Sequence, residues 1–498
     1  MADRPNLVFI FSDQQRADTM ACYGNDWLNV PNLNALAAQS FVFRNAYVTQ
    51  PVCTPARASI MTGLYPHEAG PVVNQLVLPR ETPVIAEMLP EEYYCGYYGK
   101  WHLGDDVIRQ HGFDEWVSTE DGHLPEYTRR EYRNVYSTYW NHLVANGFKP
   151  DLERMPGKYI FSPAARSELP EEFQMASFLG DQAADFIERN SDKPFVLYVS
   201  TFEPHPPYHG PLNDMYDPAQ LPVGPAFLQR PENVSLYNRV RGYYYTQYMY
   251  EGGDPSQDPY MAHNPASGQD LTTEIGWRTL RAHYLANVTL VDRMVQKITD
   301  ALERAGVADN TVVVFTSEHG EMAGDHGMLE KRSFYEESAR VPLTMRVPWL
   351  SGEQTMLEGS ASHIDLVPTL LDLLGQTPPS HLQGKSLAPV LRGDADLSAN
   401  EVVVEWNGNS DNLPDRFLGS AAINRMNALP RRCIITPDRW KLALCAGDQG
   451  ELFDMNSDPY EMTNLFDDPA QRDRVIDMSA RLRMWQQRTG DSAPLPSL

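Results

Sequence analysis

Residues 7–11 of the chain read LVFIF, an apolar run that is followed two positions later by Asp13. A run without polar alternation is typical of a strand that is buried on both faces, as in the centre of a parallel sheet. Two similar runs occur later in the chain, PFVLYVSTF at 194–202 and TVVVFTS at 311–317. Together the three runs predict the core strands of one sheet.

Segments with helical character separate these runs. PNLNALAAQ at 31–39 begins with a proline, which is favoured in the first turn of a helix. Residues 274–306 have a long amphipathic pattern that ends at a glycine, and HIDLVPTLLDLLG at 363–375 also ends at a glycine. Strands that alternate with helices indicate an α/β fold with a large mixed, mostly parallel sheet sandwiched by helices.

The chain is longer than one hydrophobic core usually supports, because it has 498 residues. We therefore expect a large domain over residues 1–393 and a small C-terminal α+β domain over 394–498. In the second domain the strand-like pieces EVVVEW, RCIITPDRWKLAL and ELFDM predict an antiparallel sheet, followed by a helix at 469–488. Residues 121–272 are rich in tyrosine, proline and acidic residues, and we expect them to form long loops over a site.

The overall charge restricts the classes of partner, because the formal net charge is −25. A surface that binds nucleic acid must be basic, so this composition argues against nucleic acid and equally against an anionic membrane surface. If the substrate is an anion, positive side chains must gather at its binding site, against the field of the whole molecule.

Neither an export signal nor a membrane span is expected. The N-terminal stretch MADRPNLVFIFSD has no basic lead, and no stretch approaches the roughly 20 apolar residues that cross a bilayer. The five cysteines are an odd number, widely spaced and without a metal-finger pattern. We therefore expect a cytoplasmic protein with reduced thiols.

Two pairs of candidate metal ligands follow predicted strands. Asp13 and Gln14 follow the first run, and Glu318 and His319 follow residues 311–317. Ligands of open α/β sheets bind beyond the carboxyl ends of the strands, so we expect the pairs to meet. Oxygen ligands suit Ca²⁺ or Mg²⁺, and the imidazole shifts the balance somewhat toward Mn²⁺. Taken singly, Asp13 and Glu318 are also compatible with ordinary caps or turn residues.

Four lysine and histidine side chains occur near the same strand ends. They are Lys100 and His102 in GKWHLG, His205 in EPHPPY and Lys331 in MLEKRSFYEES. A lone lysine is usually solvated and a lone histidine is usually structural, which is the simpler interpretation of each residue alone. That interpretation is weaker for the set, because its members gather at the same strand ends.

PVCTPARASIMTG at 51–63 places Cys53 at a predicted helix N-terminus, one turn before Arg57. Unpaired N–H groups and the helix dipole favour an anion there, and Arg57 offers a two-pronged donor for an oxyanion. Three interpretations of Cys53 compete: a buried structural thiol, a nucleophile, or the precursor of a more reactive group. A thiolate phosphatase needs a longer loop than the three residues between Cys53 and Arg57, so the plain thiol nucleophile is unsatisfactory.

The pentapeptide CTPAR at 53–57 matches the C-x-P-x-R signature of the type I sulfatases. Further blocks resemble that family in the same order, among them RPNLVFIFSDQQRADTMACYG, GKWHLG, FTSEHGEMAGDHGMLEKRSFYEESARVPL, SHIDLVPTLLDLLG and ELFDMNSDPYEMTNL. A pentapeptide arises easily by chance, but an ordered series from residue 4 to about residue 465 does not. The chain is therefore identified as a member of the type I, formylglycine-dependent sulfatases.

The resemblance implies an alkaline-phosphatase-like catalytic domain over residues 1–393 and the hydrolysis of an organic sulfate ester. It implies that a separate formylglycine-generating enzyme oxidises Cys53 to Cα-formylglycine, whose hydrate attacks sulfur and later expels sulfate. It also implies a divalent cation, most often Ca²⁺ in this family, with Mg²⁺ and Mn²⁺ as alternatives. The implied metal ligands are Asp13, Gln14, Cys53, Glu318 and His319.

The resemblance also assigns roles to the remaining site residues. Arg57 would orient the hydrate, and Lys100 and Lys331 would bind sulfate oxygens. His102 would support the hydrate or act as the base for its breakdown. His205 would protonate the leaving oxygen.

Two positions depart from the family pattern. Gln14 replaces an aspartate found in many members and keeps a side-chain oxygen, whereas Glu318 replaces the usual aspartate and moves the carboxylate by one methylene. Phosphonate monoester and phosphodiester hydrolases share the signature and the metal pairs, but they generally lack the Lys-x-His element of Lys100 and His102. An unoxidised Cys53 would instead leave a non-catalytic sulfate-ester-binding protein.

The sequence does not identify the ester. A sugar, aryl or alkyl sulfate is equally compatible with these residues, and the tyrosines from 243 to 250 can stack on sugar rings or on one another. The long loops leave the formation of a homo-oligomer open.

Overall fold

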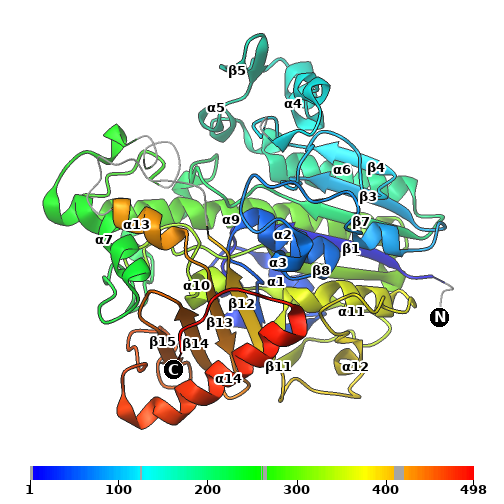
Figure 1. Ribbon diagram of the computed structural model, residues 1–498. Coiled ribbons are helices and arrows are strands. Elements are labelled where there is room, and N and C mark those ends of the chain that lie inside the picture. The colour runs from blue at the N-terminus through cyan, green and yellow to red at the C-terminus, as the bar shows by residue number, and fades with distance from the viewer. Residues whose placement is uncertain (1–3, 124–125, 259–260, 262–265, 409–419, 498) are drawn as a thin grey trace.

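The computed structural model describes residues 4–123, 126–258, 261, 266–408 and 420–497. A large sheet runs through the molecule (Figure 1). Its strands are β1 (Asn6–Ser12), β2 (Phe41–Tyr47), β3 (Tyr94–Gly99), β4 (Glu115–Ser118), β7 (Phe195–Ser200), β8 (Thr311–Ser317), β9 (Arg340–Val341), β10 (Leu343–Arg346) and β11 (Thr355–Ser362). The strand order is β11-β2-β10-β8-β1-β7-β3-β4, and β9 pairs with β2.

Most neighbouring strands are parallel, as predicted. β1 lies between β7 and β8 and is parallel to both, and β3 continues the parallel order between β7 and β4. Only β9 and β10 run antiparallel to their described neighbours. The ends of β1, β3, β7 and β8 therefore meet at one edge of the sheet, where the sequence predicted a site.

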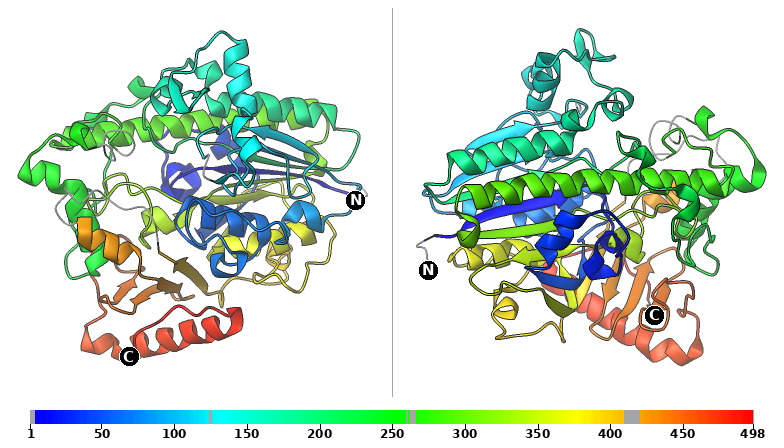
Figure 2. Two further views of the ribbon diagram at one scale, coloured as in Figure 1. Left: turned by 45° about the horizontal axis from the view of Figure 1, so that its top comes forward. Right: turned by 180° about the vertical axis from the view of Figure 1, so that it is seen from behind.

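The apolar run of β1 is buried on both faces, because alternate side chains enter different cores. Val8 and Ile10 belong to the core beneath α6 (Met175–Arg189) and α9 (Glu274–Arg304). Leu7, Phe9 and Phe11 belong to the opposite core, which also holds α2 (Cys53–Thr62) and α11 (Leu366–Leu373). The two faces are seen in Figure 1 and, from behind, in Figure 2.

The predicted C-terminal antiparallel sheet is confirmed. Its strands pair in the order β12 (Val402–Trp406), β13 (Arg431–Ile435), β14 (Trp440–Cys445) and β15 (Glu451–Asp454), and α14 (Arg472–Thr489) follows. Val403 packs in one cluster with α14, whereas Val402 and Val404 join the core of the large sheet. Because one core crosses residue 393, the division into domains at that residue stays a prediction.

The expectation of irregular structure over residues 121–272 is wrong for much of the segment. It contains α4 (Thr138–Ala145), β5 (Leu152–Met155), β6 (Lys158–Ile160), α5 (Pro163–Ser167) and α7 (Leu236–Glu251), besides α6 and β7. The tyrosine-rich stretch RGYYYTQYMYE is the body of α7, in which Tyr244 and Tyr248 donate hydrogen bonds to Asp258 at 2.8 and 2.9 Å. The hydroxyl groups of these buried tyrosines make the stretch look polar, so the apolar pattern of a helix is not visible in the sequence.

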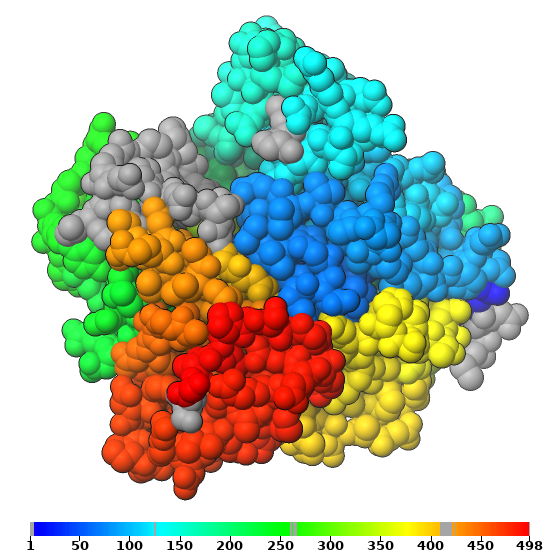
Figure 3. All heavy atoms as spheres, in the orientation of Figure 1, coloured from blue at the N-terminus to red at the C-terminus, as the bar shows by residue number. Residues whose placement is uncertain are grey.

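The segment from α4 to α5 forms a lobe at the top of the molecule, above the blue region that contains α2 (Figure 3). In the described part of the chain, no helix combines the length and apolarity that crossing a bilayer requires. All five cysteines are free thiols. The cytoplasmic location stays a prediction.

Candidate active site

Polar side chains converge at the edge where β1, β3, β7 and β8 end. Asp13 follows β1, Lys100 follows β3, and Glu318 follows β8. Cys53 begins α2 and is almost wholly buried. All ten residues predicted from the sequence lie at this edge, in contact with one another or around the adjoining cavity, and their chemical roles stay predictions.

One group in this site has the composition of a metal centre. Donor atoms of Asp13, Cys53, Glu318 and His319 all lie within 4.8 Å of one another, and the four residues are buried. His319 Nε2 is 3.3 Å from Cys53 Sγ and 3.1 Å from Glu318 Oε1. Asp13 Oδ1 is buried and finds no hydrogen-bond partner among the described residues. A buried carboxylate oxygen without a donor suits a cation, so this donor set fits a divalent metal.

Gln14 lies next to this group but faces a lysine. Its Oε1 accepts a hydrogen bond from Lys331 Nζ at 2.6 Å, and its Nε2 donates to the hydroxyl of Tyr208 at 2.8 Å. The backbone of Gln14 is left-handed, with φ of 72°, which is costly for a residue with a side chain. Such strain is typical of functional sites, and the ligand role of Gln14 stays a prediction.

Lys100 and Asp13 form a buried ion pair, with Nζ 2.6 Å from Oδ2. Burial alone would raise the pKa of Asp13, but Lys100 holds it well below its ordinary value. Burial likewise opposes a charged Lys100, yet Asp13 raises the pKa of the lysine above its ordinary value. Gly99 allows β3 to place Lys100 beside Asp13, because a Cβ at residue 99 would lie 1.9 Å from the carbonyl oxygen of Ser200.

Arg57 links the metal group to the strand ends. One Nη donates to the carbonyl oxygen of Lys100 at 2.7 Å and to Ser200 Oγ at 2.8 Å, and Nε contacts Glu318 Oε2. Its other Nη has no hydrogen-bond partner within the described chain. The two oxygens of Glu318 are thus divided between Arg57 and His319, a reach that the extra methylene allows.

His205 and Lys331 form the other side of the site. His205 Nδ1 donates to the carbonyl oxygen of Pro206 at 2.8 Å, and Nε2 lies 3.3 Å from Lys331 Nζ. Burial and the charge of Lys331 lower the pKa of His205 well below its ordinary value. In the neutral ring Nε2 therefore carries a lone pair directed at the lysine.

A cavity of 750 Å³ opens above these residues. Its floor contains Cys53, Lys100, His102, His205 and Lys331. We call the opposite side the outer wall; it is formed by the cavity-lining residues of 119–123, Glu126, 139–140 and 152–166. A volume of this size has room for a small organic molecule.

The outer wall contains polar residues that the sequence analysis missed, notably Glu120, His123, Glu126 and Arg166. One signal was present, because Glu120 is the second residue after β4, much as Asp13 is the first residue after β1. Ser118 pairs with Gly99, so β4 ends at the same edge as β3. EWVS is too short and too weakly apolar to be recognised as a strand from sequence.

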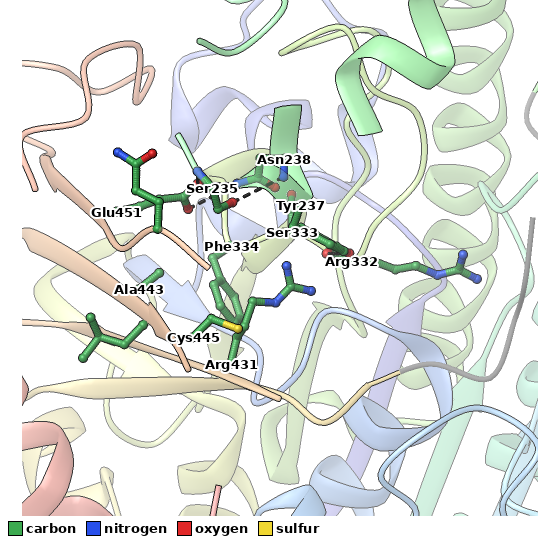
Figure 4. A pocket seen from close by; sticks show the side chains of 12 residues that line it. Ser235, Tyr237, Asn238, Arg332, Ser333, Phe334, Arg431, Ala443, Cys445 and Glu451 are labelled. Carbon is green, nitrogen blue, oxygen red and sulfur yellow. Dashed lines mark hydrogen bonds between the residues drawn. The ribbon is translucent and has the colours of Figure 1, made fainter. Parts of the chain in front are cut away.

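A second cavity lies between α7, residues 332–334 and the small sheet (Figure 4). It shares Arg332 with the larger cavity and is also lined by Tyr237 and Arg431. Its volume of 20 Å³ is enough for about one water molecule. The larger cavity is therefore the candidate substrate site.

Comparisons with known proteins match most of the length of the chain. A family model described as "Sulfatase" matches residues 5–376, and one described as "N-sulphoglucosamine sulphohydrolase, C-terminal" matches residues 324–488. An uncharacterized sulfatase of Escherichia coli (strain K12) is 30% identical over 481 residues, which cover 93% of this chain and 84% of the relative.

Two further matches extend over nearly the whole chain. The choline-sulfatase of Rhizobium meliloti is 29% identical over 482 residues, which cover 94% of this chain and 83% of that protein. The structure of a phosphonate monoester hydrolase from Silicibacter pomeroyi superposes with a TM-score of 0.77 at 24% identity, covering 98% of this chain and 96% of that one. This second likeness establishes the fold.

Proposed function

The chain belongs to the sulfatase family, and on that premise we propose that it hydrolyses an organic sulfate ester in the cavity above Cys53. The single observation that carries the proposal is the position of Cys53. It begins α2 on the cavity floor, in contact with His319 and within a group of candidate metal ligands. A buried thiol at a helix N-terminus, with two lysines on the same cavity floor, is placed to act on an anion.

The nucleophile we propose is formylglycine derived from Cys53. Its hydrate supplies an oxygen nucleophile and a second hydroxyl group through which sulfate can be released. Asp13, Cys53, Glu318 and His319 would hold the divalent cation, with Gln14 beside them. When bound, the cation supplies positive charge that polarises the nucleophile and a sulfate oxygen. Ca²⁺ is our first choice, because carboxylate and amide oxygens predominate among the proposed ligands.

The lysines bind the sulfate group and stabilise the charge that develops on its oxygens. Lys100 and Lys331 are almost wholly buried, so their charges act with little screening by water. Each is held in place before substrate arrives, Lys100 by Asp13 and Lys331 by Gln14. Preorganised donors of this kind need no rearrangement during the reaction.

His205 gives a proton to the leaving oxygen. The hydrogen bond from its Nδ1 to Pro206 fixes the ring so that Nε2 faces Lys331 and the cavity. An anionic sulfate placed between His205 and Lys331 would favour the protonated ring, which opposes the effect of burial on its pKa. His102 lies on the other side of the floor and supports the nucleophile or accepts its proton.

A paired rate comparison tests the reaction class. We expect 4-nitrophenyl sulfate to be hydrolysed with a higher kcat/KM than 4-nitrophenyl phenylphosphonate, because Lys100 and His102 supply the Lys-x-His element. Faster phosphonate turnover would make the protein a phosphonate monoester hydrolase. We keep that alternative because the Silicibacter phosphonate monoester hydrolase shares this fold.

The peptide that contains residue 53 tests the nucleophile. Mass spectrometry of protein from its native source should find formylglycine in that peptide, and Cys53→Ala should abolish turnover of both esters. Cys22→Ala is the matched control, because Cys22 is a free thiol outside the site and its loss should leave turnover unchanged. An unmodified thiol in the native protein would favour a sulfate-ester-binding protein instead.

A further inference from the structure

A second histidine lies against His102. The rings of His102 and His123 are parallel, with centroids 4.2 Å apart and an interplanar angle of 3°. His102 is 6% exposed, and the side chain of His123, which forms part of the outer wall, is 26% exposed. The stack therefore bridges the floor of the cavity and its outer wall.

Asp106 holds both members of the stack. Its Oδ1 accepts a hydrogen bond from the backbone N–H of His102 at 2.9 Å, and its Oδ2 accepts one from His123 Nδ1 at 2.9 Å. The carbonyl oxygen of His102 accepts a further bond from Thr54 Oγ1 at 2.9 Å. Thr54 follows Cys53 in α2, so these bonds connect the stack directly to the helix that carries Cys53.

The charges around the two rings differ. Carboxylates surround His123: Asp106 at 2.9 Å, Glu120 at 3.5 Å, and Glu126, which is near enough to act on it electrostatically. Burial would lower the pKa of His123, but these carboxylates raise it to about 9. Burial and the positive charges of His123, Lys100 and Arg57 lower the pKa of His102. Asp13 opposes this effect, and a carboxylate oxygen of Glu126 lies 3.9 Å from His102 Nε2.

The geometry excludes a metal site shared by the two rings. His102, His123 and Glu126 bring potential ligand atoms within 4.8 Å of one another. However, the lone pair of an imidazole lies in the plane of its ring, and one ion cannot lie in two parallel planes at once. The stack is therefore a direct contact between two imidazole rings, of which His123 is the one surrounded by carboxylates.

We propose that His123, fixed by Asp106, is a positioning residue for His102. Its ring holds the ring of His102 flat against the outer wall, and its positive charge keeps His102 neutral, so that His102 has a lone pair with which to accept a proton. Consistent with this role, His102 Nδ1 is buried without a hydrogen-bond partner among the described residues. The proposal rests on the proposed function, in which His102 acts beside the nucleophile.

The first test needs no turnover. In protein labelled with ¹³Cε1-histidine, the signal of His102 is identified by its absence in His102→Gln. In the wild type we expect it to remain that of a neutral ring at pH values where an ordinary histidine is protonated. His123→Phe keeps a flat ring but removes the charge. In this variant the pH midpoint at which the His102 ring becomes protonated should rise by about one pH unit or more. An unchanged midpoint in that variant would overturn the proposal.

The second test is kinetic. His123→Phe should lower kcat for 4-nitrophenyl sulfate by about ten-fold with little change in KM, because the base is displaced and partly protonated. His123→Arg retains a flat cation that can donate to Asp106, and it should restore kcat to within about three-fold of the wild type. His142→Phe, a change of another half-buried histidine on α4, should leave kcat unchanged. Equal losses of kcat in the Phe and Arg variants would show that the charge of His123 does not support His102, which overturns the proposal.

The two tests separate this inference from the proposed function. If the wild type fails to hydrolyse sulfate esters but the midpoint of His102 still rises in His123→Phe, the positioning of His102 stands and the function is wrong. If the wild type hydrolyses the ester and the midpoint does not move, the function stands and the positioning is wrong.

Discussion

The floor of the cavity and its outer wall are built in different ways. On the floor, Cys53 begins α2 and Lys100 follows β3, and the neighbouring Asp13, Glu318 and His319, at the ends of β1 and β8, are completely buried. The outer wall comes from short elements and turns, and the side chain of its Arg166 is 20% exposed, whereas Glu120 and Glu126 are buried. The floor is therefore held rigidly for chemistry, whereas the wall can vary with the leaving group.

The pattern of charge follows the same division. On the floor each buried cation contacts an acid or an amide: Lys100 contacts Asp13, Arg57 contacts Glu318, and Lys331 contacts Gln14. On the wall Arg166 is 4.0 Å from Glu120, a distance at which a partly solvated pair contributes little free energy. Removing one partner should therefore matter greatly on the floor and little at the Arg166–Glu120 pair of the wall.

The largest effect is expected at Asp13. Asp13→Asn removes a proposed metal ligand and leaves Lys100 buried beside a neutral group. Loss of one partner of a buried pair typically costs about 3–5 kcal/mol of unfolding free energy. We expect kcat/KM for 4-nitrophenyl sulfate to fall more than about 100-fold, beyond the loss usual for outer-shell partners of a metal. Denaturant unfolding and steady-state kinetics measure the two effects.

A second variant separates charge pairing from ligation. Asp13→Asn/Lys100→Met removes the unpaired charge, so it should regain most of the unfolding free energy but no activity. Asp26→Asn, at an exposed aspartate of the following loop, is the control and should change neither quantity. If Asp13→Asn retained both stability and activity, the floor would not be the preorganised charge cluster described above.

A smaller and more selective effect is expected at His205. His205→Gln keeps a polar side chain but cannot protonate the leaving oxygen. An aryl leaving group with a low pKa needs little protonation, whereas an alkyl alcohol needs it fully, so general acid catalysis is worth about 10²–10⁴-fold only for the latter. We expect kcat/KM for 4-nitrophenyl sulfate to change less than about ten-fold and that for an unactivated alkyl sulfate to fall more than about 100-fold.

For His205 the decisive quantity is the difference between the losses of kcat/KM for these two esters. Equal losses for both would mean that His205 orients Lys331, 3.3 Å away, and does not supply a proton. His283→Gln is a suitable control, because its imidazole Nδ1 donates to the carbonyl oxygen of Tyr208 and it lies outside the cavity lining. His283→Gln should not change the ratio of kcat/KM between the two esters.

The sequence was informative wherever a side chain followed a long apolar strand. β1 and β8 are both seven residues long and wholly buried, so Asp13 and Glu318 were found from the pattern alone. Lys100 and His102 were also found, although the reason for their placement, Gly99 against Ser200, appears only in three dimensions. A strand with both faces buried determines where its carboxyl end lies, which is why the floor could be predicted.

The wall could not be predicted, because no long-range pattern marks it. β4 is four residues long and half-buried at its start, so the position of Glu120 at a strand end is not visible in the sequence. α7 buries tyrosines whose hydroxyls reach Asp258 and the backbone of Arg332, and a polar, aromatic stretch of this kind resembles a loop. In both cases a tertiary partner completes a pattern that the local sequence leaves incomplete.

The smallest effect is expected at Arg166, on the wall. The side chain lies over the ring of Phe202, with its guanidinium carbon 5.0 Å from the ring centroid, and the net charge of −25 repels an anionic ester from the whole molecule. Arg166→Met keeps the stem and removes the local attraction. We expect KM to rise about three-fold at low salt with kcat unchanged, and the difference to shrink as salt is added.

Arg129→Met is the matched control for Arg166, because it makes the same change of charge at an exposed arginine outside the cavity lining. If both variants raise KM equally, the effect belongs to the net charge and the wall has no local influence on binding. If Arg166→Met instead lowers kcat, Arg166 acts on the chemical step, as we propose for His123, and not on capture of the ester. A rise in KM confined to Arg166→Met would show that Arg166 affects capture of the ester and not its cleavage, in contrast to the floor and to His123.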